Sequence, residues 1–359
     1  MRYKKKLIIL FVLILVLTGI QLLLPYRPDL VAAYDKHIFR PYQSLRDIAF
    51  GFIPVSIGDI LYICLFLSLI TTIIKWLYYL IRFNNKKHAL AHSMLRALLT
   101  IGTLYLLFFI GWGGNYFKPS LPVYWGLNKT GTTDDAELLA FDSFLVHKMN
   151  TYAPHFHNAQ LKEYSHKAKE YYIQYTNGKA RRFGLKAKPT LFGQWMQVWG
   201  IQGYYNPFTG EAQVNKHLPP FMLPFVVSHE MAHQSGIAAE EDANLMAYVL
   251  GAQVHDSSFR YSAYFNIWLY THSRLYHIDS LKANSVKKLL NPISISHIDT
   301  LRAIRQRYKN GFSEYGTDLY DGYLKLHNQK DGIKSYSRVS SSAWAWEQQA
   351  AKDSIIYLP

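Results

Sequence analysis

Residues 226–244 read Val-Val-Ser-His-Glu-Met-Ala-His-Gln-Ser-Gly-Ile-Ala-Ala-Glu-Glu-Asp-Ala-Asn, and this stretch decides how the rest of the chain is interpreted. It holds the pattern His-Glu-x-x-His, with His229 and His233 four residues apart. Side chains with this spacing lie one turn apart on the same face of a helix, so both imidazoles can reach one zinc ion at about 2.0–2.1 Å. Glu230 follows the first histidine and can act as general base toward a metal-bound water. The pattern therefore indicates metal-assisted hydrolysis.

The flanking residues predict that this helix is buried. Prolines at positions 219, 220 and 224 precede the pattern, where proline is tolerated at a helix start, and the remaining residues of 221–227 are apolar. A glutamate inside such a helix is costly unless it is paired or lies close to a metal. Gly236 comes three residues after His233, where helices commonly end in a left-handed residue.

A second helix is expected to begin at Glu240-Glu241-Asp242. A catalytic zinc site uses three protein ligands and keeps one position open for water. A carboxylate that follows a tight turn after the first helix is well placed to be the third ligand. Asn244 is four residues after Glu240 on the same helix face, where it could form a hydrogen bond with a ligand histidine.

The combined pattern resembles two groups of proteins. His229-Glu230-x-x-His233 followed by Glu240-x-x-Ala243-Asn244 is similar to gluzincin-type zinc metallopeptidases over residues 189–255. That resemblance implies Zn²⁺ held by His229, His233 and Glu240, with Glu230 as the base and Asn244 supporting a ligand. Only six residues separate His233 from Glu240, fewer than in many gluzincins, so Glu241 and Asp242 stay open as alternative ligands.

Most of the chain also resembles an uncharacterised family of bacterial three-span membrane proteins. This similarity rests on His-Glu-x-x-His-Gln-x-Gly, on Glu-x-x-Ala-Asn, and on Gly-Tyr-Tyr-Asn-Pro-Phe-Thr-Gly-Glu at residues 203–211. Neither resemblance implies a known substrate.

Three apolar stretches predict a membrane anchor over residues 1–112. Each is long enough to span a bilayer, and they cover about residues 7–24, 60–81 and 89–112. The N-terminal tail carries Arg2 and Lys4–Lys6, and the turn between the second and third stretches carries further basic residues. By the positive-inside rule both lie in the cytoplasm, and residues 25–59 form an external loop. Residues 113–359 then lie outside the cytoplasm, which predicts a protein of the bacterial inner membrane.

Composition is consistent with this location. The net charge is +15, which suits a protein beside anionic lipid, and no nucleic-acid recognition motif is present. The single cysteine, Cys64, lies in the second apolar stretch, so the outer region has no disulfide and no thiolate nucleophile.

Hydrophobic periodicity in the outer region predicts a mostly helical α+β domain with a small sheet, which we expect to be zincin-like. Strand character is expected over residues 188–199, and a hairpin over residues 200–205 and 211–214. The expected helices cover residues 134–149, 161–175, 261–276, 296–308 and 319–327.

Two further roles follow from the zincin comparison. Residues 210–215 are the best candidate for an exposed strand edge that pairs with substrate backbone. Tyr204 or Tyr205 is a candidate donor to a developing oxyanion, and His255, His272 and His277 are weaker candidates. Simple packing is the competing interpretation of each of these side chains.

The sequence therefore predicts a membrane-anchored zinc hydrolase with polypeptide as the favoured substrate. A hydrolase of other amide or ester bonds in the cell envelope is one alternative, because the same water chemistry serves both. A non-catalytic membrane scaffold that keeps a vestigial zinc site is the other. Protein partners are not predicted.

Overall fold

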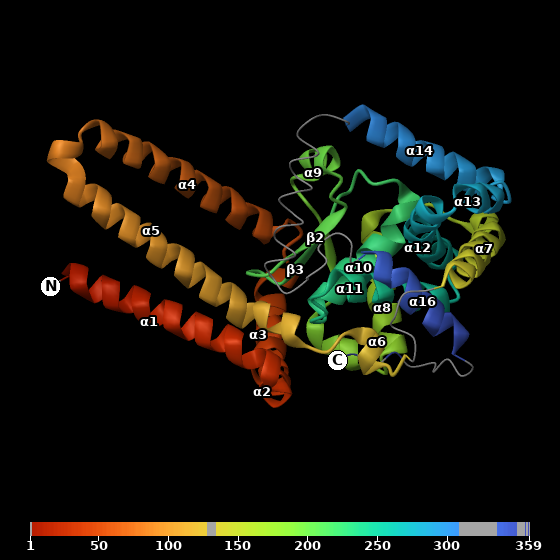
Figure 1. Cartoon of the computed structure of the whole chain (residues 1–359), viewed down its shortest axis with the longest axis horizontal. Coiled ribbons are helices and arrows are strands. Elements are labelled where there is room, and N and C mark those ends of the chain that lie inside the picture. The colour runs from red at the N-terminus through yellow and green to blue at the C-terminus, as the bar shows by residue number, and fades with distance from the viewer. Residues whose placement is uncertain (1, 128–133, 309–335, 350–355, 357, 359) are drawn as a thin grey trace.

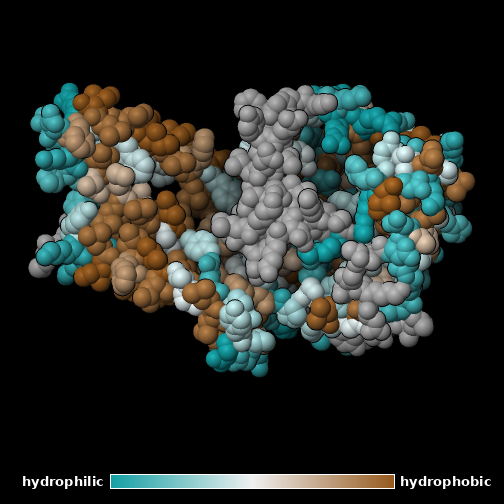
Figure 2. Space-filling view, in the orientation of Figure 1, coloured by the Kyte–Doolittle hydropathy of each residue, from teal (hydrophilic) through white to brown (hydrophobic). Residues whose placement is uncertain are grey.

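Three long helices project from one side of a mostly helical body (Figure 1). The structure, a computed structural model, describes residues 2–127, 134–308 and 336–349, together with 356 and 358. The long helices are α1 (Arg2–Leu23), α4 (Ile57–Ile81) and α5 (Phe83–Gly111), and each is long and apolar enough to cross a membrane. Their side chains form the exposed apolar surface seen in Figure 2. These features indicate a membrane protein and confirm the three predicted apolar spans.

The segment between the first two spans is folded, although a loop was expected there. It contains the short helices η1 (Leu24–Tyr26), α2 (Pro28–Tyr34), η2 (Asp35–Phe39), α3 (Arg40–Arg46) and η3 (Asp47–Gly51). Phe39 is fully buried, and its ring lies 5.9 Å from that of Trp112 and 6.5 Å from that of Phe183. The sequence pattern missed this structure because the segment is stabilised by contacts with distant residues.

A three-stranded sheet lies where the long helices meet the body (Figure 1). Strand β3 (Glu211–Val214) pairs in parallel with β1 (Ala187–Pro189) and antiparallel with β2 (Gly203–Asn206), so the order is β1-β3-β2. The predicted hairpin is confirmed. Its turn is closed by the Asn206 side chain, which accepts hydrogen bonds from the backbone of residues 208 and 209. The predicted edge at residues 210–215 is wrong, because β3 is the central strand.

Residues 188–199 do not form the expected strand. Only β1 is extended, and α9 (Gly193–Trp199) is a short helix that ends at Gly200, with φ of 70°. Strand propensity depends strongly on which face of a residue is buried. Here Met196 faces the core while Trp195 and Trp199 are exposed, which is a helical pattern of burial.

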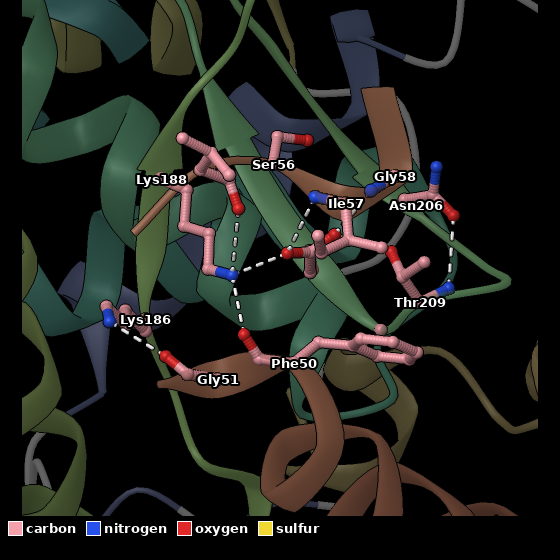
Figure 3. Close-up of polar contacts among 12 residues, drawn as sticks. Phe50, Gly51, Ser56, Ile57, Gly58, Lys186, Lys188, Asn206 and Thr209 are labelled. Atoms are coloured by element: carbon pink, nitrogen blue, oxygen red, sulfur yellow. Dashed lines mark hydrogen bonds and ion pairs between the residues drawn. The ribbon is translucent and has the colours of Figure 1, made fainter. Parts of the chain in front are cut away.

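A buried ion pair joins the sheet to the start of α4 (Figure 3). Lys188 of β1 donates to Glu211 of β3 at 2.5 Å and to the carbonyl oxygen of Phe50 at 2.8 Å. Glu211 also accepts from the backbone N–H of Gly58 at 2.6 Å and from the Thr209 hydroxyl at 2.8 Å. The Glu211 carboxylate therefore accepts from backbone N–H groups at the N-terminus of α4 that have no partner within the helix, and it fixes α4 to the sheet.

The body is built from helices packed around α10 (Leu223–Gln234), whose contacts include α8, α11, α12 and the sheet. The predicted helices over residues 134–149, 161–175, 261–276 and 296–308 are confirmed, and residues 319–327 lie outside the described residues. The other helices of the body are η4 (Gly113–Phe117), α6 (Leu121–Tyr124), α7 (Asp135–Tyr152), η5 (Ala153–His155), α8 (Leu161–Tyr175), η6 (Lys179–Phe183), η7 (Pro220–Met222), α11 (Glu240–Gln253), α12 (Ser257–Ile278), α13 (Ser280–Lys287), α14 (Pro292–Tyr308) and α16 (Tyr336–Gln348).

Candidate metal centre

Helix α10 and the turn after it position three potential ligands. Pro224 lies in the first turn of the helix, and the residues leading to His229 are buried. The helix ends at Gln234 and is followed by Gly236, which has a φ of 93° and whose N–H donates to the His233 carbonyl at 2.9 Å. This left-handed turn reverses the chain, so that α11 begins at Glu240 beside the histidines.

The three side chains converge on one point. The Nε2 atoms of His229 and His233 are 3.2 Å apart, and Nε2 of His229 is 3.2 Å from a carboxylate oxygen of Glu240. Nε2 of His233 is 3.7 Å from the other oxygen of the same carboxylate. Four ligands in a tetrahedron around zinc lie about 3.3–3.4 Å from one another when each is about 2.0–2.1 Å from the metal. The cluster therefore has a donor set and spacing that fit a zinc ion.

The groups behind the histidines orient their rings. His233 Nδ1 lies 2.7 Å from the carbonyl oxygen of Ile237, which places the proton on Nδ1 and leaves Nε2 facing the cluster. His229 Nδ1 is buried and has no hydrogen bond of ordinary geometry within the described part of the chain. Asn244 lies close enough to favour the protonated form of His229. The supporting role of Asn244 stays a prediction.

The charges of the three side chains strongly affect one another. Burial lowers the pKa of His229 more than its contacts with Glu240 and Asn244 raise it. Burial opposes charge on His233 as well, but the hydrogen bond and the charge of Glu240 outweigh it and raise the pKa of His233 to about 9. Glu240 keeps a pKa well below its usual range, because its contacts with both histidines outweigh its burial. Protons and a metal would compete for the same place.

Glu230 is buried next to this cluster and is incompletely bonded. It is 4% exposed, and its Oε2 atom has no hydrogen-bond partner among the residues that the structure describes. Burial, with a smaller contribution from Glu240, raises the pKa of Glu230 to about 8 against the opposing charge of His233. A carboxyl group that titrates near neutrality is suited to general acid–base chemistry.

A glycine of the sheet makes room for this carboxylate. A Cβ atom at Gly203, the first residue of β2, would lie 2.6 Å from Oε1 of Glu230. A side chain at this position would therefore displace either the strand or the carboxylate. Sequence patterns do not predict this approach, because Gly203 and Glu230 belong to different elements.

The neighbours of Glu240 have other surroundings. Glu241 forms a 2.7 Å ion pair with Arg338 of α16. Asp242 is buried, and burial raises the pKa of its carboxyl to about 8. Of the three acids, it is Glu240 that groups with both histidines.

Both tyrosines proposed as oxyanion donors contact the segment before and at the start of α4. The Tyr204 hydroxyl donates to Asp59, and its ring stacks on that of Tyr62 with centroids 6.0 Å apart. The Tyr205 hydroxyl donates to Gln43 at 2.9 Å. Their hydroxyls thus have partners on the N-terminal segment.

One tyrosine that the sequence interpretation did not single out is close to the cluster. Burial raises the pKa of Tyr270 on α12, and the negative charge of Glu240 raises it further. His272, which was singled out on the same helix, instead lies 3.1 Å from Asp142. Helical periodicity predicted α12, but only packing shows which of its residues lies near Glu240.

Comparison with known proteins identifies the family of this chain. No curated protein and no solved structure matches it. One family model matches residues 34–341, which include the helical segment before α4 from Tyr34 onward, the sheet and the cluster of His229, His233 and Glu240. Since this match covers most of the 359 residues, the chain belongs to the family described as "Protein of unknown function (DUF3810)".

Proposed function

We propose that this protein is a membrane-anchored, zinc-dependent hydrolase of the zincin type, related to gluzincins, that acts on peptide bonds. The observation that carries the proposal is the convergence of His229, His233 and Glu240 beside a buried and incompletely bonded Glu230. A structural zinc site is closed by four ligands and needs no adjacent base. Three ligands and a neighbouring carboxylate are instead the composition of a catalytic site.

Each residue of the site has a distinct task. A zinc ion held by His229, His233 and Glu240 would supply Lewis-acid chemistry to water and to the scissile carbonyl group. Glu230 would take a proton from the attacking water and pass it to the leaving amine. Burial raises the pKa of Glu230 in the metal-free cluster, so this carboxyl group can hold a proton as well as accept one.

The position of β2 favours a polypeptide as substrate. Within the described residues, β2 pairs with β3 on one side only, so its other edge has no neighbouring strand. Its first residue, Gly203, lies against Glu230. An extended peptide added along this edge would be held by backbone hydrogen bonds next to the base.

The basic residues favour a site outside the cytoplasm. The first turns of α1 and the residues around the junction of α4 and α5 both carry several lysine and arginine side chains, and both lie at the ends of the long helices that are distant from the body (Figure 1). The positive-inside rule assigns them to the cytoplasm of a bacterial inner membrane, with the body on the periplasmic or outer side.

Zinc content of the purified full-length chain in detergent tests the metal site. We expect about one zinc ion per chain in the wild type and none in a His229→Ala/His233→Ala variant. His272→Ala is the matched control, because it removes a partly buried histidine that pairs with Asp142 away from the cluster. Wild-type protein that folds without zinc, and binds none when zinc is added, would overturn the proposal.

Substrate assays of the same preparations test the reaction class. Cleavage of casein that depends on Glu230 supports a peptidase. Release of soluble products from cell-wall fragments, without cleavage of casein, would assign the site to other amide or ester bonds of the envelope. A cellular defect on deletion of the gene that Glu230→Gln does not reproduce would indicate a scaffold.

A further inference from the structure

Helix α9 and Leu191, two residues before its start, form an exposed apolar face. Leu191, Trp195 and Trp199 follow one another at intervals of four residues, and their exposed fractions are 56%, 70% and 48%. Gly193 and Met196, on the opposite side, are buried in the body. The helix is therefore held firmly while two indole rings point outward. We call Leu191, Trp195 and Trp199 the α9 face.

The α9 face begins at the outer end of a spanning helix. The backbone N–H of Leu191 donates to Asp59 at 2.6 Å, and the Thr190 hydroxyl donates to the same carboxylate at 3.1 Å. Asp59 is the third residue of α4 and is fully buried. Figure 1 shows α9 near the point where α4 meets the body. The position of α9 relative to the bilayer is thus fixed by hydrogen bonds.

Other contacts and exposed residues mark the same boundary. Phe52 and Val55, in the turn that leads into α4, are 77% and 46% exposed. Tyr62, one turn further along α4, stacks on Tyr204 of the sheet. Apolar exposed residues therefore occur on both the body and the chain that leads into α4, close to the end of α4 that meets the body.

We propose that the α9 face inserts into the interfacial layer of the bilayer that α4 spans. Tryptophan is enriched at this depth, because its ring is apolar and its N–H can bond to water or headgroups. Transfer of exposed apolar side chains out of water is favourable. Continuity with α4 assigns lipid as the occupant of this face in preference to a protein partner or a second copy.

Seating α9 in the bilayer would also place the metal cluster at the membrane surface. β2 follows α9 closely in the chain, and its Gly203 lies against Glu230. Trp112, the residue after α5, lies edge-on to His233 with ring centroids 6.0 Å apart. This consequence rests on the proposed function: the polypeptides cleaved would be those held at or close to the membrane.

Spin labels on the full-length chain in vesicles of phosphatidylcholine and phosphatidylglycerol test the position of the α9 face. Cys64 is the single cysteine and is exposed on α4, so its label is a reference inside the bilayer. In a Cys64→Ser background, Trp195→Cys reports on the α9 face. Leu281→Cys is the matched control, because Leu281 is an apolar residue of α13, 81% exposed, on the side of the body distant from the long helices.

Collision rates of each label with oxygen, which dissolves in lipid, and with a water-soluble nickel chelate give its depth. We expect the ratio of oxygen to nickel collisions at position 195 to exceed that at 281 and to fall below that at Cys64. Equal ratios at 195 and 281 would overturn the proposal. A label at 195 shielded from both reagents would also overturn it, because a protein would then cover the face.

Zinc content of the same preparations separates this proposal from the metal proposal. The depth of position 195 does not depend on metal, so a chain without zinc and with a membrane-inserted label refutes the hydrolase alone. A chain with zinc and a water-exposed label refutes the lipid contact alone.

Discussion

Glu211 and Glu230 are both buried glutamates close to the same small sheet, yet their surroundings differ. Glu211 is 3% exposed and accepts hydrogen bonds from Lys188, Thr209 and the start of α4. Glu230 is 4% exposed and has one oxygen without a partner in the described part of the chain. Buried polar groups are normally satisfied, because an unmade hydrogen bond in a low dielectric is costly. The first carboxylate is thus a structural link, whereas the second has an oxygen that the described residues leave without a hydrogen bond.

Glu230→Gln should produce the largest change in activity. The amide keeps the size of the side chain but cannot accept a proton, so we expect hydrolysis to fall about 10²- to 10⁴-fold with zinc content unchanged. The rate of hydrolysis by the wild type and the variant, compared at equal zinc content, measures this change. Full activity in the variant would remove Glu230 as the base.

Glu211→Ala should have its main effect on stability. It leaves Lys188 buried without its carboxylate, and breaking such a pair costs about 3–5 kcal/mol. Chemical unfolding of the full chain in detergent measures the loss. A Glu211→Leu/Lys188→Met double variant should lose much less, since both charges are removed together. Equal losses in the two variants would show that the ion pair is not the cause.

Gly203→Ala tests a position that is linked to both glutamates. Strand β2 pairs with β3, which carries Glu211, and Gly203, the first residue of β2, lies against Glu230. The new Cβ would crowd Oε1 of Glu230, and overpacking of this kind costs about 1–3 kcal/mol. We expect reduced hydrolysis with zinc retained. Gly19→Ala in α1 meets no atom within 4 Å and should change neither property. Unaltered activity in Gly203→Ala would mean that the carboxylate can move without consequence.

The pH dependence of zinc binding tests the protonation of the metal-free cluster. The pKa of His233 is raised to about 9 in the metal-free cluster, so a proton must leave before zinc binds at neutral pH. Zinc affinity should therefore rise with pH between 7 and 9, by up to about tenfold per unit, and level off above 9. Titration calorimetry in buffers of different ionisation enthalpy counts the protons released. Binding that is independent of pH in this window would contradict the assignment of a proton to His233.

The spacing of residues 226–244 was informative because the relevant geometry is local. Two histidines one helical turn apart, a glycine that stops the helix and three apolar stretches long enough to cross a bilayer each follow from neighbouring residues. The structure confirms the three apolar helices and the hairpin, and it brings His229, His233 and Glu240 together. Zinc binding and catalysis stay predictions.

Errors occurred where the outcome depends on residues far apart in the chain. The central position of β3 depends on β1, and the helix at residues 193–199 depends on which side of it faces the core. The hydroxyls of Tyr204 and Tyr205, whose role as oxyanion donors stays a prediction, also bond to residues more than a hundred positions earlier. Sequence periodicity carries no information about such partners.

The sequence by itself determined the three spans, helix α10 and the class of chemistry to be tested. These follow from hydrophobic periodicity and segment length, which depend only on residues that are close together along the chain. Only the tertiary structure decided that Glu240 faces the histidines, that Gly203 admits Glu230 and that the start of α4 is attached to the sheet through Glu211. These arrangements arise when separate elements pack and bury polar groups together, which requires each group to find a partner in three dimensions.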